Sequence, residues 1–342
     1  MEGPTFSIQW HLTTRCEQRC KHCYLFNSPQ ASSEIAGERL VTLSRLKRIA
    51  DDHAQTCRRL GARPRVSLTG GNPLLHEHFW TLLAYLKNLG TKVHVMGNPF
   101  GITDEVARDL VAHDVSKFQL SLDGLEATHD SLRKHGSYRE TERACRTLTQ
   151  NGVGVAIMTT VSRLNMGEIP ELAERVVEMG ARAYAFARLC PSDGDASVLP
   201  TAAEYRQFLS VMWDAFRRLD GRGTSFVMKD HLWSLFLKEI GEFHPQDTGG
   251  VIVDGCGLGI SHLTVLADGS VYACRRFSSG VGDVPRQSLY DIFLGRQMDE
   301  YREVERMEKC GKCELLPYCR GCMAVAHSVS GDWRAADPQC WK

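Results

Sequence analysis

Short apolar runs alternate with amphipathic stretches through the first 190 residues of the chain. Each run has the length and composition typical of a strand, and each amphipathic stretch repeats its apolar positions at helical spacing. The runs predict six strands, over 6–12, 65–69, 92–96, 117–122, 154–161 and 183–188. The stretches between them predict helices over 34–60, 76–89, 103–113, 139–151 and 168–179.

Regular strand–helix alternation is typical of parallel β/α units, and it predicts an α/β fold that closes as a barrel or partial barrel. In such folds the residues that do chemistry stand at the C-terminal ends of the strands. The polar and cysteine-bearing segments of this chain come directly after predicted strands. We therefore expect a functional site along one rim of a partial (β/α)6 barrel.

The alternation stops after Arg188. The following pattern predicts an amphipathic helix over 201–219, an apolar turn at 231–237 and a hairpin over 263–274 with an Asp268-Gly269 turn. A last helix is expected over 288–306, and the rest of the C-terminal part is cysteine-rich loop. These changes predict three parts: a barrel over 1–200, a helical bridging region over 201–254, and a small cysteine-rich α+β domain over 255–342.

The charge of the chain is balanced, with 41 Lys and Arg against 41 Asp and Glu. A neutral chain has no bulk field that would attract nucleic acid or an anionic membrane, so neither is expected as a partner. No run of 18 apolar residues is present, and the N-terminus lacks the pattern of a signal peptide. We therefore expect a cytoplasmic protein.

Thirteen cysteines are many for a protein of a reducing compartment, where clustered thiols more often bind metal or do chemistry. Three of them form an N-terminal group and seven a C-terminal group. Cys57 and Cys145 lie on predicted helices and are interpreted as core thiols. Cys190 follows the sixth strand.

The N-terminal group has the spacing Cys16-x3-Cys20-x2-Cys23. Four ligands complete a zinc site or a cubane iron–sulfur cluster, so three thiolates on one loop leave one metal corner free. Such a corner is useful only if something binds there. The spacing alone also suits zinc, with His11 or His22 as the fourth ligand.

The segment from Cys16 to Cys23, placed after the first strand of a β/α array, resembles the signature of the radical S-adenosylmethionine (SAM) superfamily, with His22 in its aromatic position. The resemblance implies a [4Fe–4S] cluster held by the three cysteines, with SAM on the fourth iron. It also implies one-electron cleavage of SAM to methionine and a 5′-deoxyadenosyl radical that takes a hydrogen atom from the substrate.

Other positions resemble the SAM-binding elements of this family. Gly70-Gly71-Asn72-Pro73 resembles the loop that receives the SAM amino group, although the family has Glu where this chain has Asn72. Ser121 and Asp123 match a common motif, in which Ser121 would face the ribose and Asp123 either helps or forms a turn. The remaining candidates are Asn98 for the ribose, Arg133 and Arg143 for the SAM carboxylate, and Val161 beside adenine.

The seven C-terminal cysteines include two Cys-x2-Cys pairs, which alone would suit a zinc ribbon. Together they resemble the SPASM extension of radical SAM enzymes, which carries two auxiliary iron–sulfur clusters. The resemblance assigns Cys310, Cys313, Cys319 and Cys340 to auxiliary cluster II. It assigns Cys256, Cys274 and Cys322 to auxiliary cluster I.

In family members with a complete auxiliary cluster I, the fourth cysteine lies a few residues before the first one. By this resemblance the cluster lacks a fourth cysteine here, because residues 245–255 contain none. The fourth position is expected to be filled by Asp254 or Cys190, or to be a vacant iron. A vacant iron could bind a thiolate or selenolate of the substrate directly, since iron–sulfur sites favour soft ligands. Cys190 is also a candidate hydrogen-atom donor to a substrate radical, and the alternative is an incidental free cysteine.

The resemblance implies an enzyme that modifies a ribosomally synthesised peptide by thioether formation, carbon–carbon crosslinking, oxidation or epimerisation, with a cysteine or selenocysteine as the favoured target. The expected partners are the precursor peptide, a separate leader-binding protein, and a flavodoxin- or ferredoxin-type electron donor. A tetrapyrrole-modifying enzyme and a sulfatase-maturing dehydrogenase are alternatives within the family. A non-catalytic zinc-binding interaction protein is the alternative of another class.

Overall fold

The structure is a computed structural model that describes residues 3–27, 31–38, 41–191, 194–284 and 286–342. The chain divides into two compact units, each assembled from separated segments. Unit 1 contains residues 1–120, 140–155 and 258–302. Unit 2 contains residues 121–139, 156–257 and 303–342.

Unit 1 is built on four parallel neighbouring strands that follow one another in sequence. They are β1 (Thr5–Thr13), β2 (Arg63–Gly70), β3 (Lys92–Met96) and β4 (Val115–Ser121). Val66 and Leu68 are fully buried, whereas Arg65 and Ser67, which alternate with them along the strand, are only half-buried. This alternation arises because successive side chains of a strand point to opposite faces of the sheet.

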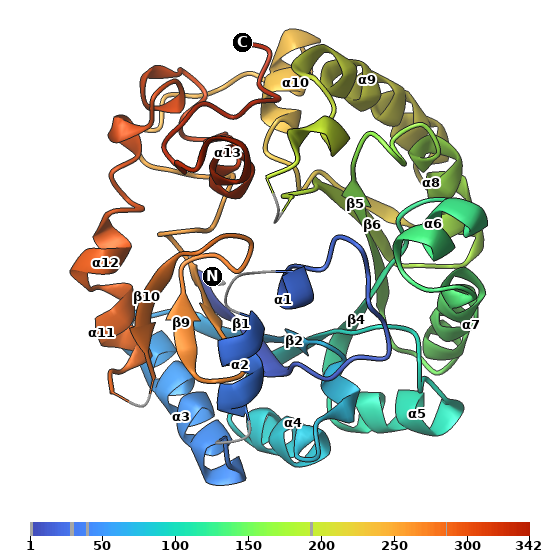
Figure 1. The fold of residues 1–342 in the computed structure, drawn as a ribbon, viewed down its shortest axis with the longest axis vertical. Helices are drawn as coiled ribbons and strands as arrows, with labels where there is room; N and C mark the ends of the chain where they lie inside the picture. The colour runs from blue at the N-terminus through green and yellow to red at the C-terminus, as the bar shows by residue number, and fades with distance from the viewer. Residues whose placement is uncertain (1–2, 28–30, 39–40, 192–193, 285) are drawn as a thin grey trace. The chain divides into compact units, whose positions relative to one another are not determined.

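Three helices return the chain between these strands and cover one face of the sheet (Figure 1). They are α3 (Leu43–Arg59), α4 (Phe79–Asn88) and α5 (Asp104–Ala112). The side chains of Thr42 and Thr103 accept hydrogen bonds from the first turns of α3 and α5, so each helix begins at a capping threonine. The short helices α1 (Tyr24–Asn27) and α2 (Ala31–Glu38) follow β1.

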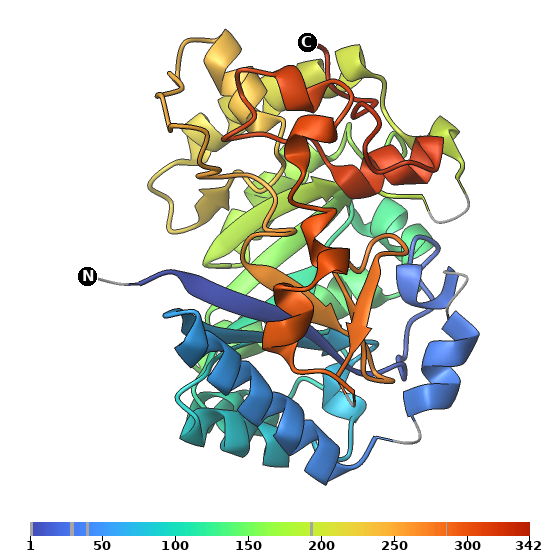
Figure 2. The same cartoon turned by 90° about the vertical axis from the view of Figure 1, so that its left-hand side faces the viewer.

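A C-terminal hairpin completes the sheet of unit 1 on the other side of β1 (Figures 1 and 2). Strand β8 (His262–Val265) pairs in parallel with β1, so that Ser7 lies opposite His262. Strands β9 (Ser270–Tyr272) and β10 (Gly280–Asp283) continue the sheet antiparallel to their neighbours. The helices α11 (Leu289–Phe293) and α12 (Arg296–Asp299) follow.

Unit 2 contains the parallel strands β5 (Val155–Val161), β6 (Ala183–Arg188) and β7 (Ser225–Val227). Its helices include α6 (Glu126–Leu132), α8 (Ile169–Glu178), α9 (Ala202–Leu219), α10 (Trp233–Glu239) and α13 (Met323–Ser330). Helix α7 (Ser137–Gln150) begins in unit 2 and continues in unit 1. Buried aromatic rings fill the space between β6, α9 and α10. The ring centroid of Phe186 lies 5.8 Å from that of Trp233 and 5.1 Å from that of Phe208.

The six predicted strands and the α/β class are confirmed. Two helix predictions differ from the structure. The stretch 34–60 contains the separate helices α2 and α3, and α3 starts afresh at its cap Thr42. The stretch 288–306 contains α11, α12 and the 3-10 turn Val304–Arg306, because the extended backbone of Gly295 interrupts the first two. The three-part division of the chain stays a prediction.

In the described ranges, no helix combines the length and the apolar character needed to cross a bilayer.

Candidate functional site

The N-terminal cysteines lie on the loop that leaves the C-terminal end of β1 in unit 1. All three side chains are half-buried. The Cys23 N–H donates to the Cys20 carbonyl at 3.0 Å. The Cys23 carbonyl accepts from the N–H groups of Phe26 and Asn27, and these bonds start helix α1. The loop thus turns back on itself between its second and third cysteines. His22 is half-buried within this turn.

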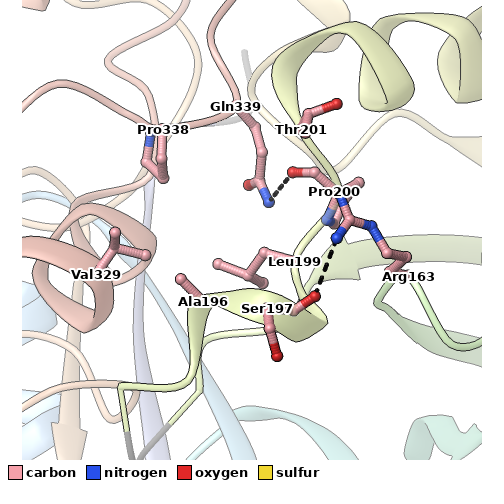
Figure 3. Close-up of a pocket in the computed structure, with 9 residues that line it drawn as sticks. All are labelled: Arg163, Ala196, Ser197, Leu199, Pro200, Thr201, Val329, Pro338 and Gln339. Carbon is pink, nitrogen blue, oxygen red and sulfur yellow. Dashed lines mark hydrogen bonds between the residues drawn. The ribbon is translucent and has the colours of Figure 1, made fainter.

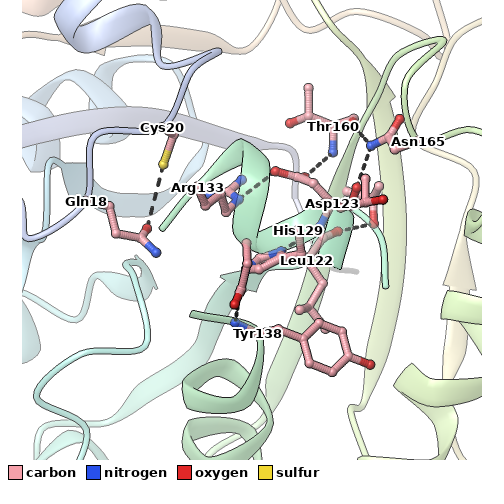
Figure 4. A network of polar contacts seen from close by, with 12 residues as sticks. Gln18, Cys20, Leu122, Asp123, His129, Arg133, Tyr138, Thr160 and Asn165 are labelled. Carbon is pink, nitrogen blue, oxygen red and sulfur yellow. Dashed lines mark hydrogen bonds and ion pairs between the residues drawn. The ribbon is translucent and has the colours of Figure 1, made fainter. Parts of the chain in front are cut away.

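Two N–H groups point to the sulfur of Cys16. The backbone N–H of Gln18 is 3.4 Å from Cys16 Sγ, and the side-chain amide of Asn98 is 3.5 Å from it. N–H donors stabilise thiolates and tune the iron–sulfur clusters that such thiolates hold. The Cys20 thiol lies 3.8 Å from Gln18 Oε1 (Figure 4). The donor set of three soft sulfurs with amide donors therefore fits an iron–sulfur cluster.

The two glycines after β2 let their backbone approach the cysteine loop closely. The Gly71 N–H donates to the Thr13 carbonyl at 2.7 Å, and the Asn72 N–H donates to the Arg15 carbonyl at 2.8 Å. A Cβ on Gly70 would stand 2.2 Å from Thr13 O, and one on Gly71 2.1 Å from Arg15 O. Gly70 also has φ +124°, which favours glycine. Any other residue would separate the loop from the cysteines.

Glu17 connects this loop to the end of β3, which the sequence analysis did not predict. Its carboxylate accepts from Asn72 Nδ2 at 3.1 and 3.2 Å and from Asn98 Nδ2 at 2.7 Å. Asn72 Nδ2 also donates to Asn98 Oδ1 at 3.2 Å. The two asparagines are buried, at 0% and 6% exposed. The family position that carries a glutamate has Asn72 here, but a carboxylate is still present, supplied by Glu17.

A buried polar cluster surrounds Tyr24, the first residue after Cys23. Arg275 donates to Glu34 Oε2 at 2.7 Å and lies 4.9 Å above the Tyr24 ring. His11 is fully buried, and its Nδ1 lies 3.7 Å from Glu34 Oε1. Burial and then Arg275 hold the pKa of His11 well below its usual value. Arg275 follows Cys274, whose backbone N–H and carbonyl are both bonded by Ser279.

Asp123 is the centre of a buried network in unit 2 (Figure 4). Its carboxylate accepts from Arg133 Nε at 2.6 Å and from the Thr160 N–H at 2.8 Å. Its backbone N–H donates to His129 Nδ1, and its carbonyl accepts from Asn165. Asp123 therefore holds the end of β5 in place, whereas its sequence context also allowed it to be only a turn former. The guanidinium of Arg133 therefore forms an ion pair with the Asp123 carboxylate.

The remaining predicted cofactor residues lie at or near strand ends. Ser121 ends β4, and Val161 ends β5 with a fully buried side chain. Cys190 follows β6 by two residues and is half-buried. Arg143 is on α7 and donates to Glu140 and to the Ile102 carbonyl. Their roles toward SAM or a substrate stay predictions.

Six of the seven C-terminal cysteines belong to unit 2, and Cys274 belongs to unit 1. The side chains of Cys310, Cys319 and Cys322 are buried, at 8–9% exposed. Burial raises the pKa of the Cys310 and Cys319 thiols to about 12. Bound iron lowers thiol pKa values, so a cluster held by these cysteines would keep their sulfurs as thiolates.

Arg188 organises the loops that carry these cysteines. The guanidinium is 1% exposed and makes two hydrogen bonds to Asp337, at 2.6 and 2.8 Å, and one to Asp230, at 2.9 Å. Asp337 in turn accepts from the Cys322 N–H at 2.7 Å, and its carbonyl accepts from the Cys340 N–H at 3.0 Å. The sequence pattern alone marks Arg188 only as the end of a strand.

Unit 2 also contains a surface cavity of about 380 Å³ (Figure 3). Arg163 on its wall is bonded to Glu204 and to the Ser197 carbonyl, and Gln339 donates to the Pro200 carbonyl. None of the predicted site residues lines this cavity. Its polar groups are occupied by neighbours within the unit.

Two family models match this chain. The model of the radical SAM superfamily matches residues 10–176, and the model of the iron–sulfur cluster-binding SPASM domain matches residues 256–323. The chain is a radical SAM enzyme with a SPASM domain. The predicted family and enzyme class are thereby confirmed.

Curated relatives are similar over almost the whole chain. The AdoMet-dependent heme synthase of Methanosarcina barkeri is 28% identical, with 97% of this chain and 95% of the relative aligned. The mycofactocin maturase MftC of Mycolicibacterium smegmatis is 29% identical, over 97% and 82%. The Fe-coproporphyrin III synthase of M. barkeri is 24% identical, over 98% and 87%. Relatives of this radical SAM enzyme therefore include a heme synthase, an Fe-coproporphyrin III synthase and a mycofactocin maturase.

Two solved structures share the fold. SuiB of Streptococcus suis, bound to S-adenosylmethionine, superimposes with a TM-score of 0.76 at 16% identity, covering 99% of this chain and 78% of SuiB. The structure of anSMEcpe with bound AdoMet gives a TM-score of 0.71 at 16% identity, over 98% and 93%. The radical SAM enzyme thus has the fold that the alternation of its strands and helices predicted.

Proposed function

We propose that this enzyme cleaves SAM at a cluster held by Cys16, Cys20 and Cys23 and modifies a ribosomally synthesised peptide. When bound, the reduced cluster supplies the electron that splits SAM into methionine and a 5′-deoxyadenosyl radical, which takes a hydrogen atom from the substrate. The observation that carries the proposal is the junction between the cysteine loop and the Gly70–Pro73 loop. Three separate segments meet there around Glu17, Asn72 and Asn98.

The chain's own residues have distinct tasks in this proposal. Gly70 and Gly71 bring the backbone of their loop against the cysteine loop, and the amides of Gln18 and Asn98 stabilise the Cys16 thiolate. The carboxylate of Glu17 is positioned to attract a cationic amino group next to that thiolate. Ser121, Asp123, Arg133, Arg143, Val161 and His22 complete the proposed SAM-binding set.

The C-terminal cysteines would hold two auxiliary clusters that accept the electron left on the substrate after hydrogen removal. Asp254 is exposed and accepts from the Gly255 N–H at 2.7 Å, so an oxygen ligand is available beside Cys256. The alternatives for the fourth ligand of auxiliary cluster I are Cys190 and a thiolate or selenolate of the substrate. A substrate ligand would direct the reaction to a cysteine or selenocysteine residue.

A peptide substrate is supported by the similarity to the maturase MftC. The products would be a thioether, a carbon–carbon crosslink, an oxidised residue or an epimer. A separate leader-binding protein would deliver the precursor, and a flavodoxin or ferredoxin would supply electrons. The similarity to two tetrapyrrole synthases supports a second candidate, the modification of a tetrapyrrole side chain.

Anaerobic reconstitution tests the proposal. The loaded protein should contain eight or more irons with matching sulfide, absorb near ~400 nm, and release 5′-deoxyadenosine when given SAM and a reductant. Replacing Cys16, Cys20 and Cys23 with Ala should abolish this release but leave the C-terminal clusters. Zinc in place of iron, or release that survives the triple change, would overturn it. A candidate precursor peptide and coproporphyrin III, added separately, decide between the two substrates.

A further inference from the structure

One face of strands β2 to β4 in unit 1 carries mainly polar side chains, with Met96 as an apolar exception. The register pairs Ser67 with His94 and His94 with Lys117, so these side chains share a face. Arg65, two residues before Ser67, stands on the same face. Val66, Val93 and Phe118, which neighbour them along the strands, point the other way and are buried. We call Arg65, His94 and Lys117 the basic cluster.

The basic cluster has no acidic partner in the part of the chain that the structure describes. None of its three side chains takes part in an ion pair there, although all are half-buried. The charges that affect their pKa values are all positive and come from Arg63, Lys92 or the cluster itself. Partial burial of the Arg65 and Lys117 cations without a counter-ion costs free energy, so we expect these two residues to have a function.

The cluster offers donors of two kinds. Burial, followed by the charges of Lys117, Arg65 and Lys92, lowers the pKa of His94 to about 3, so its ring is neutral at pH 7 and can donate a hydrogen bond. Arg65 adds a planar fork that matches a carboxylate, and Lys117 adds a point charge. Together they are suited to an anion.

The cluster lies at a distance from the proposed site of hydrogen removal. Arg65 precedes Gly70 by five residues of β2, which is about 16 Å along the strand. An anion bound to the cluster would therefore belong to the far end of a substrate whose reacting end lies beside the Gly70–Pro73 loop. Both proposed substrate types, peptides and tetrapyrroles, carry carboxylates.

On these grounds we propose that Arg65, His94 and Lys117 bind a carboxylate of the substrate. This inference rests on the proposed function, because it identifies the group by which the substrate is held. It also makes the polar face of β2 to β4 a substrate-binding surface.

Direct binding tests the inference with cluster-loaded enzyme in the absence of reductant. The probes are coproporphyrin III, its tetramethyl ester and a hexaglutamate peptide. The double variant Arg65→Met with Lys117→Met should weaken binding of the preferred acid at least tenfold. The tetramethyl ester should bind the wild type as weakly as coproporphyrin III binds this variant. The preferred probe identifies the source of the carboxylate as a tetrapyrrole or a peptide.

Two controls make the result specific. Lys87→Met with Arg108→Met removes the same charges from the exposed surfaces of α4 and α5 and should leave binding unchanged. Arg65→Lys with Lys117→Arg keeps the charges and should retain binding within about threefold. Failure of both acids to bind the wild type, or equal binding of the preferred acid by the double variant, would refute the inference. Stronger competition by inorganic phosphate than by propionate would also refute it.

The proposed function is tested separately in the same samples. Substrate-independent release of 5′-deoxyadenosine should be equal in wild type, the double variant and both controls, because the basic cluster does not contact the cysteine loop. Loss of release in the wild type would reject the proposed function. Normal release with unchanged probe binding in the double variant would reject only the carboxylate site.

Discussion

At the scale of single residues, the carboxylate of the candidate site comes from the cysteine loop instead of from the Gly70–Pro73 loop. The family's loop carries a glutamate where this chain has Asn72. The structure instead places the carboxylate of Glu17 against both Asn72 and Asn98. The two positions are 55 residues apart. Motif positions were predictable because spacing encodes them, whereas no local pattern marks Glu17 as the partner of Asn72.

Exchanging the acid and the amide tests this pairing. Asn72→Glu should loosen the loop and weaken SAM binding about tenfold, because it removes a donor and places two carboxylates at hydrogen-bond distance. Glu17→Gln combined with Asn72→Glu restores one acid and one amide, and should recover binding to within about threefold. The measurement is a SAM titration followed by electron paramagnetic resonance of the reduced cluster. Equal affinity in the single variant would show that the two side chains act independently.

At the scale of helices and strands, apolar periodicity was sufficient to predict the six strands, and Cys57 and Cys145 are buried as predicted. It failed where an element is too short to show a period, as for the three residues of β7 and the seven of α6. It also merged α2 with α3, because the amphipathic pattern continues across the start of α3 at Thr42. Helix boundaries depend on caps more than on periodicity.

Helix α3 contains a buried histidine that should make stability depend on pH. His53 is 0% exposed, and burial lowers its pKa to about 4. Because the folded pKa lies below the unfolded value near 6.5, its stabilising contribution is complete above that value and is lost as the pH falls toward 4. Between pH 7.5 and 5 the loss should be about 2 kcal/mol in the free energy of unfolding.

Urea unfolding at several pH values measures this effect. His53→Leu should remove about 2 kcal/mol of the difference between pH 7.5 and 5. His135→Leu is the matched control, since the side chain of His135 is fully exposed, and it should leave the pH dependence unchanged. A slope that is the same in His53→Leu and wild type would show that another group is responsible.

At the scale of the whole chain, single charges hold together segments that are far apart in sequence. Arg188 bonds to Asp230 and to Asp337, 42 and 149 residues away. Burial opposes the ionisation of Asp230, but Arg188 and then His231 outweigh it and keep its pKa below the usual value. Sequence analysis could not pair these residues, because it shows no contact between distant positions. It located the C-terminal cysteines but not the arginine that fixes their loops.

Removing this arginine should leave the buried carboxylates of Asp230 and Asp337 without the charge that pairs with both of them. Arg188→Met is expected to lower the free energy of unfolding by about 3–5 kcal/mol and to reduce the iron retained by the C-terminal cysteines. Arg163→Met breaks an exposed ion pair with Glu204 and should cost less than about 1 kcal/mol. Anaerobic denaturation and iron analysis measure both. A loss in Arg188→Met no larger than in Arg163→Met would contradict the structural role.

The parallel pairing of β1 with β8 has a consequence for synthesis on the ribosome. Ser7 to Trp10 pair with His262 to Val265, so one edge of the first strand stays open until more than 250 further residues have been translated. An open strand edge is a site for pairing with other nascent chains. Truncated products that stop before His262 should therefore aggregate, and the growing polypeptide should need chaperone protection until its last quarter emerges.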